Sequence, residues 1–225
     1  MKLKICGMNH NPTEVAQLQP DYLGFIFWEP SSRYFSGELP KLPTSIKKVG
    51  VFVDAPLEEV LEKVEQHQLD AVQLHGKESA AYCNALRHPE LVSGSHLSEM
   101  LNQVQHDEFE IIKVFSIKDD FDFDALKDYE EACDYYLFDT KGRLPGGNGY
   151  TFDWSVLEKY SSSKPYFLSG GIGLDAKEKL KDFLNSPASK NCFAIDVNSK
   201  FETAPGLKNI EDLKIFIESL ESGHN

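Results

Sequence analysis

The chain has 225 residues, of which 41% are hydrophobic and 26% are charged, as is typical of a globular protein with a substantial core. Its 23 Lys and Arg against 36 Asp and Glu give a formal net charge of −13, which disfavours nucleic acid and anionic membranes as partners. No apolar run approaches the roughly 18–20 residues of a membrane span, so we expect no membrane segment. A small phosphorylated ligand remains compatible with this charge, because a few local amides and cations can bind it.

The cysteines and the N-terminal residues indicate a cytoplasmic protein. The N-terminal stretch becomes polar at Asn9 and has no apolar signal-peptide core. The four cysteines lie far apart without a C-x-x-C pair, so we expect free thiols in a reducing compartment and no structural zinc. We also expect no cofactor. The cysteines are Cys6, Cys83, Cys133 and Cys192.

Eight short apolar runs recur along the chain with helical patterns between them. They are rich in Val, Ile, Phe and Tyr, and they are almost continuously apolar, as parallel strands buried on both faces are. We predict strands at residues 3–6, 22–27, 49–53, 71–74, 111–115, 135–138, 166–168 and 193–197.

Amphipathic patterns fill most of the gaps between these runs. The clearest has apolar residues at i, i+3, i+4 and i+7 over residues 57–64. A helix at residues 37–46 is the weakest prediction, because Pro40 and Pro43 interrupt it. We predict further helices at residues 13–18, 79–86, 121–131, 152–160, 176–184 and 210–220.

This alternation predicts a single (β/α)8 TIM barrel, compact for its class. The competing architecture is a doubly wound open sheet, but its G-x-G-x-x-G turn is absent after the first strand. Residues 88–110 do not fit the alternation, since the next strand should follow within a few residues. We interpret them as an insertion on the N-terminal, non-catalytic face of the barrel, with an interface element as the alternative.

Two of the predicted strands end in side chains that can transfer protons. Cys6 ends the first strand and Asp139 ends the sixth. The C-terminal ends of barrel strands meet at one mouth, where catalytic groups lie. A thiol and a carboxyl facing each other there can act as base and acid. Each also has a simpler interpretation, Cys6 as a small buried apolar residue and Asp139 as a helix N-cap.

Further polar side chains follow the second, fourth, seventh and eighth strands. Arg33 can hold a carboxylate in two parallel hydrogen bonds, or it can be a solvated loop residue. Gln73 and His75 end the fourth strand, and we favour a place for His75 near the substrate over a purely structural role. Barrel phosphate sites use the loops after the seventh and eighth strands. Here these loops hold Ser169, Gly170, Gly171, Asp196, Asn198 and Ser199.

Nine short motifs occur in one register along almost the whole chain, apart from residues 88–110 and the last few. They are KICGM at 4–8, GFIF at 24–27, SRY at 32–34, GVFVD at 50–54, QLHG at 73–76, LFDT at 137–140, GNG with FDW at 147–154, LSGGI at 168–172 and IDVNS at 195–199. In this order they resemble the phosphoribosylanthranilate isomerase family of (β/α)8 enzymes. Any one motif would be weak, but nine in register are a strong resemblance.

The resemblance implies an Amadori rearrangement in tryptophan biosynthesis, from N-(5-phosphoribosyl)anthranilate to 1-(2-carboxyphenylamino)-1-deoxyribulose 5-phosphate. Asp139 would protonate the ring oxygen as the ring opens, and Cys6 would remove the C2 proton. Both pKa values then need to move towards neutrality. Arg33 would bind the anthranilate carboxylate. Asp196 repels a phosphate dianion, so we expect it to bond a substrate hydroxyl or to orient its loop.

The chain departs from the family pattern at three positions. Asn148 stands where Thr is usual, Lys200 where Gly is common, and Asn209 where Asp is usual. None of these changes removes a catalytic group, and Lys200 adds a positive charge to the phosphate loop. The glycine-rich loop at residues 141–148 is expected to cover the site as a lid.

Two other functions compete with the isomerase. The first is another phosphate-binding barrel enzyme of the tryptophan or histidine pathway. A histidine-pathway isomerase would place Asp at the end of the first strand, and indole-glycerol-phosphate synthase would need a Lys there. The second is a non-catalytic interaction barrel, which the presence of Cys6, Arg33 and Asp139 argues against. The family allows a monomer or a homodimer.

Overall fold

Eight parallel strands close into a barrel in which each strand pairs with the next along the chain and the last pairs with the first. The structure is a computed structural model that describes residues 1–89, 109–118, 120–140 and 153–221. The strands are β1 (Lys2–Ile5), β2 (Tyr22–Ile26), β3 (Lys47–Phe52), β4 (Ala71–Leu74), β5 (Glu110–Ile117), β6 (Tyr135–Thr140), β7 (Tyr166–Leu168) and β8 (Cys192–Val197). The predicted (β/α)8 barrel is confirmed, and all eight strands lie where the sequence placed them.

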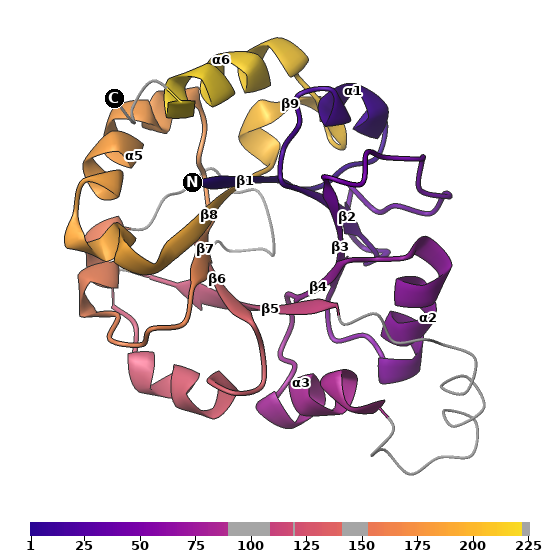
Figure 1. Cartoon of the computed structure of the whole chain (residues 1–225), viewed down its shortest axis with the longest axis horizontal. Coiled ribbons are helices and arrows are strands. Elements are labelled where there is room, and N and C mark those ends of the chain that lie inside the picture. The colour runs from indigo at the N-terminus through magenta and orange to yellow at the C-terminus, as the bar shows by residue number, and fades with distance from the viewer. Residues whose placement is uncertain (90–108, 119, 141–152, 222–225) are drawn as a thin grey trace.

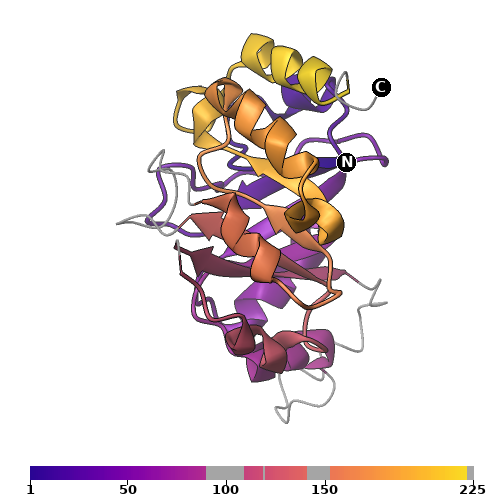
Figure 2. The ribbon, with the colours of Figure 1, turned by 90° about the vertical axis from the view of Figure 1, so that its left-hand side faces the viewer.

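Helices lie outside the strands and cover the barrel (Figures 1 and 2). The α-helices are α1 (Pro12–Ala16), α2 (Leu57–His67), α3 (Ala80–Arg87), α5 (Lys177–Leu184) and α6 (Ile210–Glu221). From opposite ends of the chain, α1 and α6 lie side by side in both views. A small antiparallel pair, β9 (Glu202–Ala204) and β10 (Leu207–Lys208), precedes α6. No helix in the described ranges is long and apolar enough to cross a membrane.

The helix predictions fail at three connections. Residues 37–46 form no helix, because prolines at 40 and 43 lack the backbone donors that a helix needs. After β5 and β6 the connections are the 3-10 helices η2 (Phe123–Tyr129) and η3 (Trp154–Lys159). Aromatic rings fill the space beside them, with ring centroids 5.0–6.4 Å apart. These rings belong to Tyr136, Phe138, Tyr160 and Tyr166.

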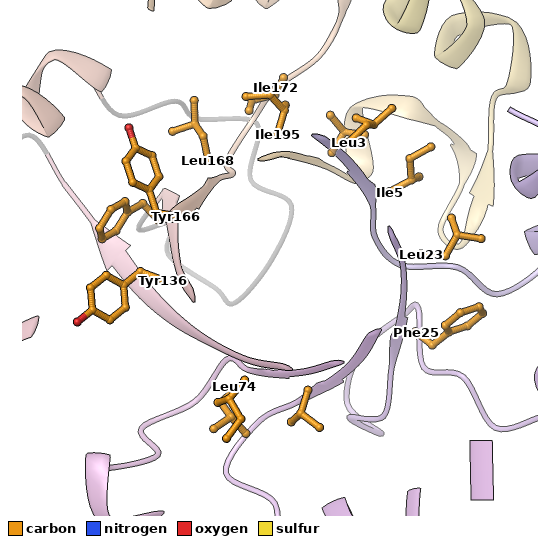
Figure 3. Packing of buried hydrophobic residues seen from close by; sticks show 14 of the residues in the cluster. Leu3, Ile5, Leu23, Phe25, Leu74, Tyr136, Tyr166, Leu168, Ile172 and Ile195 are labelled. Atoms are coloured by element: carbon orange, nitrogen blue, oxygen red, sulfur yellow. The ribbon is translucent and has the colours of Figure 1, made fainter. Parts of the chain in front are cut away.

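Alternation along the strands separates two cores. One lies between the barrel and the helices, and Figure 3 shows side chains such as Leu23, Phe25 and Tyr136 pointing outward into it. The other lies inside the barrel, and it contains Tyr22, Val49, Ala71, Ile112, Val114, Leu137, Phe167 and Ala194.

Polar side chains occupy the next inward positions towards the C-terminal ends of the strands. Gln73, Asp139, Ser169 and Asp196 each stand two residues beyond an apolar member of the inner core. Because side chains repeat every two residues along a strand, these four face the barrel interior in a layer above that core. The apolar inner core therefore supports a polar layer at the barrel mouth.

Two sequence features lie outside the described residues. One is most of the insertion at residues 88–110. The other is the glycine-rich loop that contains Asn148 and was expected to act as a lid. Both stay predictions.

Candidate active site

Cys6 follows β1 directly at the barrel mouth. Its backbone N–H donates to the carbonyl of Val197 on β8 at 2.8 Å, and its residue surface is 4% exposed. Gly24 on β2 faces the thiol, since a Cβ built there would lie 2.8 Å from Sγ of Cys6. Gly24 therefore makes the space in which the sulfur lies.

Lys4 stands two residues before Cys6 and is fully buried. Its Nζ donates to Oδ1 of Asp196 at 2.8 Å, and the two residues are register partners across β1 and β8. The other oxygen of Asp196 accepts from Oγ of Ser169 at 3.1 Å. Ser169 begins the glycine loop after β7, so this bond agrees with the expectation that Asp196 orients a loop. No role for Lys4 was predicted from the sequence.

The electrostatic surroundings act on Cys6 in both directions. Burial raises the pKa of the Cys6 thiol, the charge of Lys4 is the strongest opposing influence, Asp196 adds to the increase and Lys208 reduces it. The net change in the pKa of Cys6 is upward, opposite to the change that a general base at this position requires. Burial lowers the pKa of Lys4, but Asp196 and Cys6 raise it by more than burial lowers it. The net pKa is raised, so Lys4 is charged at neutral pH.

Arg33 is held by a carboxylate of the same chain. Its Nε lies 2.9 Å from both oxygens of Glu202, and its Nη2 lies 2.6 Å from Oε2. Glu202 also accepts from Nζ of Lys208 at 2.7 Å. Burial raises the pKa of Glu202, but Arg33 and Lys208 outweigh it and hold that pKa below its usual value. This arrangement uses one edge of the guanidinium and leaves Nη1 for another acceptor.

Lys208 extends this network to the loop after β8. Its Nζ donates to Oδ1 of Asn198 at 2.7 Å. Gly7 has a φ of +74°, and a Cβ there would clash with Cδ of Arg33 at 2.8 Å and with Oδ1 of Asn198 at 2.5 Å. Only glycine suits this conformation and this crowding. Arg33, Asn198 and the Cys6 loop are thereby brought together, a contact that was not predicted from the sequence.

Asp139 lies near the end of β6, opposite His75. Its Oδ2 is 3.4 Å from Nε2 of His75, and its Oδ1 accepts from the backbone N–H of Thr140 at 2.9 Å. The amide nitrogen of Gln73 is 3.2 Å from Nδ1 of His75. If this amide donates, Nδ1 is an acceptor and the proton of a neutral ring stays on Nε2, facing Asp139. Each residue was predicted as part of the site, but their contact was not.

The two predicted phosphate loops lie against each other. Gly170 and Gly171 have positive φ values of 96° and 68°, and a side chain at Gly170 would collide with Thr140. Ser199 opens the short 3-10 helix η6 (Ser199–Phe201). The family departure Lys200 lies 3.1 Å from Asp175, which joins the loop after β8 to the loop after β7.

Two further residues that sequence reasoning missed are Glu202 and Lys208. Both are almost fully buried, with side chains 5% and 0% exposed. In the sequence, both residues lie in a short polar stretch after the eighth strand, and such a stretch predicts an ordinary surface turn. The other sequence departure, Asn209, accepts hydrogen bonds from the N–H groups of Glu211 and Asp212, as an Asp would at the start of α6.

The remaining thiols contribute nothing to this site. All four cysteines are free, as predicted. Burial raises the pKa of Cys83 to about 11 and those of Cys133 and Cys192 to about 12. Within the described residues, no group of three or more His, Cys, Asp or Glu side chains could hold a metal ion.

The fold and this layer of polar and titratable groups define a class: a (β/α)8 barrel with its candidate active site at the C-terminal mouth, where barrel enzymes have theirs. The family model of N-(5'-phosphoribosyl)anthranilate (PRA) isomerase matches residues 3–219, and the chain belongs to that family. It is therefore an isomerase of tryptophan biosynthesis, in place of the other barrel functions considered above.

Known proteins of the family cover almost the whole chain. The N-(5'-phosphoribosyl)anthranilate isomerase of Parabacteroides distasonis is 38% identical, over 98% of this chain and 93% of its own length. That of Phocaeicola vulgatus is 35% identical, over 98% of both. Among solved structures, the isomerase of Thermus thermophilus has a TM-score of 0.77 at 26% identity and covers 99% of both chains.

Proposed function

We propose that this isomerase uses Cys6 as general base and Asp139 as general acid in the Amadori rearrangement of N-(5'-phosphoribosyl)anthranilate. The observation that carries the proposal is their placement at the ends of β1 and β6 on one barrel mouth. The strands β7 and β8 separate them, so the two groups can address one substrate from different sides.

The substrate assignment is supported by a solved relative. A phosphoribosyl anthranilate isomerase that is 25% identical to this chain, with a TM-score of 0.70, was solved in complex with reduced 1-(o-carboxyphenylamino)-1-deoxyribulose 5-phosphate. That compound has a carboxylate at one end and a phosphate at the other. We propose that Nη1 of Arg33 binds the carboxylate and that the Ser169–Gly171 and Asn198–Ser199 loops bind the phosphate.

The steps then assign one proton to each group. Asp139, beside His75 and the Thr140 N–H, gives its proton to the ring oxygen as the ring opens to the Schiff base. Cys6 then takes the C2 proton, and the resulting enolamine tautomerises to the ketone. Gln73 and His75 hold the acid side of the site, while Asp196 fixes Ser169 at the start of the phosphate loop.

This chemistry needs a protonated carboxyl together with an ionised thiol, although carboxyl groups ordinarily titrate several pH units below thiols. The reactive state is therefore the minor one. Between the two pKa values its fraction is constant and equals the ratio of the two acid dissociation constants. Each unit by which the pKa of Cys6 is lowered thus raises kcat/KM about tenfold.

The proposal is tested by generating the substrate in situ and following the decay of its fluorescence. We expect Cys6→Ser and Asp139→Asn each to lower kcat by about 10²–10⁴-fold, the usual contribution of a general acid or base. Cys192→Ser, at the other end of β8, and Asp134→Asn, just before β6, are matched controls that should retain turnover. Undiminished turnover in a folded Cys6→Ser or Asp139→Asn protein would remove that residue from the mechanism.

The cytoplasmic location and the choice between monomer and homodimer stay predictions. A relative from Thermotoga maritima, 26% identical with a TM-score of 0.67, was solved as monomers generated from a dimeric isomerase. The dimer is therefore one of the states that the family adopts.

A further inference from the structure

Lys4 is a buried cation that the proposed steps do not use. Its residue surface is 0% exposed, and its Nζ donates a hydrogen bond to Oδ1 of Asp196 at 2.8 Å. Removing an ammonium from water costs several kcal/mol, which a single ion pair often fails to recover. An apolar residue would fill this interior position at lower cost. We therefore expect the positive charge of Lys4 to have a function at this position.

The geometry places that charge next to Cys6. Cys6 continues β1 directly and comes two residues after Lys4, so the two side chains share the inward face. Asp196 stands beside Lys4 on β8 and is fixed in turn by Ser169. Gly24 on β2 leaves the sulfur no neighbouring side chain at that position.

We propose that Lys4 is a positioning residue of the isomerase, whose buried ammonium stabilises Cys6 as the anionic base while Asp196 holds that ammonium in place. The inference rests on the proposed role of Cys6. Lys4 keeps its own proton throughout, and only the charge on the sulfur changes when Cys6 takes the C2 proton.

Three charged groups act on Cys6, and Lys4 is the one best placed to stabilise the anion. Lys4 lowers the pKa of the thiol more than Lys208 does, and more than Asp196 raises it. Lys208 lies on β10, outside the barrel strands, and its Nζ donates to Glu202 on β9 and to Asn198 in the loop after β8. The net effect of the Lys4–Asp196 pair is therefore to favour the thiolate against burial.

The test is the rate at which iodoacetamide alkylates Cys6 at pH 6–10, because only the thiolate reacts. Mass spectrometry of the Cys6 peptide separates this rate from those of Cys83, Cys133 and Cys192. A nearby opposite charge shifts a pKa by about 1–3 units, so Lys4→Met should slow alkylation at pH 8 by about 10- to 1,000-fold. Lys4→Arg, which keeps the charge, should restore much of the rate.

Lys4→Met leaves the carboxylate of Asp196 buried without its cation, so this variant can fail to fold. The variant Lys4→Met/Asp196→Asn removes both charges, and it should also slow alkylation, but by less. The matched control is Lys113→Met/Glu78→Gln, which removes another buried ion pair, 2.7 Å long, and should leave the rate at Cys6 unchanged. A wild-type rate in the folded double variant, or an equal loss in the control, would overturn the proposal.

The same variants separate a charge effect from simple loosening of the site. If Lys4 acts through Cys6, the plateau of kcat/KM falls tenfold for each unit by which the alkaline limb of its pH profile moves upward. The alkylation assay contains no substrate. A failure of the Lys4 proposal is therefore distinguishable from a failure of the Cys6→Ser turnover test.

Discussion

The two halves of the site are built differently. Around Cys6, the ion pairs Lys4–Asp196 and Lys208–Glu202 are buried, with side chains 0–5% exposed, and only Arg33, which also binds Glu202, is partly exposed. Around Asp139, the side chains are fewer and partly exposed, with His75 and Asp139 at 21% and 15%. The proposed base, Cys6, lies among fixed charges, whereas the proposed acid, Asp139, lies where water and substrate can reach it. A buried thiol needs such a field to ionise, while a carboxyl that must hold a proton does not.

The largest effect should come from breaking the buried pair on the Cys6 side. Removing one partner of a buried ion pair costs about 3–5 kcal/mol, because the other charge is left without compensation. We expect Lys4→Met to lower the free energy of unfolding by that amount in urea denaturation. A loss below about 1 kcal/mol would show that the pair is not part of a fixed charged structure.

The next largest effect should come from removing the guanidinium group of Arg33. Arg33→Lys keeps the charge but loses the planar donors that hold Glu202 and, as proposed, the anthranilate carboxylate. Hydrogen bonds to charged groups contribute about 1.5–3 kcal/mol, which corresponds to a KM about 10- to 100-fold higher with kcat less affected. Steady-state kinetics measure this, and an unchanged KM would place Arg33 outside the substrate site.

Glu202→Gln should have a smaller effect with a distinct pH dependence. The pKa of Glu202 is lowered in the folded protein, so its contribution to stability is present above the unfolded pKa and is lost as pH falls through the folded value. We expect the variant to lose about 1–3 kcal/mol at pH 7 and to respond less to acid than the wild type. Urea denaturation at several pH values checks this, and parallel curves for the two proteins would contradict it.

The smallest change is expected on the other side of the site. His75→Gln removes a partner of Asp139 that is partly exposed, and such pairs contribute about 0–1 kcal/mol. Stability should therefore stay within that range, while kcat falls about 2- to 10-fold, since Asp139 loses a neighbour rather than its proton. If this variant unfolds as easily as Lys4→Met, the contrast between the two sides is wrong.

The strands could be predicted because their apolar, β-branched runs reflect burial on both faces, which is local information. The connections after β5 and β6 could not, since a short apolar pattern does not separate an α-helix from a 3-10 helix, and the ring contacts of Tyr136 and Tyr166 beside them are tertiary. Cys6 and Asp139 stood out because reactive side chains closed apolar runs. Lys4, Glu202 and Lys208 did not, because only the closure of β1 onto β8 and the turn into β10 bury their charges.

The central claim is that Cys6 takes a proton and Asp139 gives one. The pH profile of kcat/KM in the wild type, Cys6→Ser and Asp139→Asn tests it most directly, because this ratio reports the groups of the free enzyme. The wild type should give a bell-shaped pH profile of kcat/KM. Cys6→Ser should lose the decline on the acid side, and Asp139→Asn should lose the decline on the alkaline side. The account would be contradicted if both variants kept both limbs of the pH profile. It would also be contradicted if Cys6→Ser lost the alkaline limb and Asp139→Asn lost the acid limb.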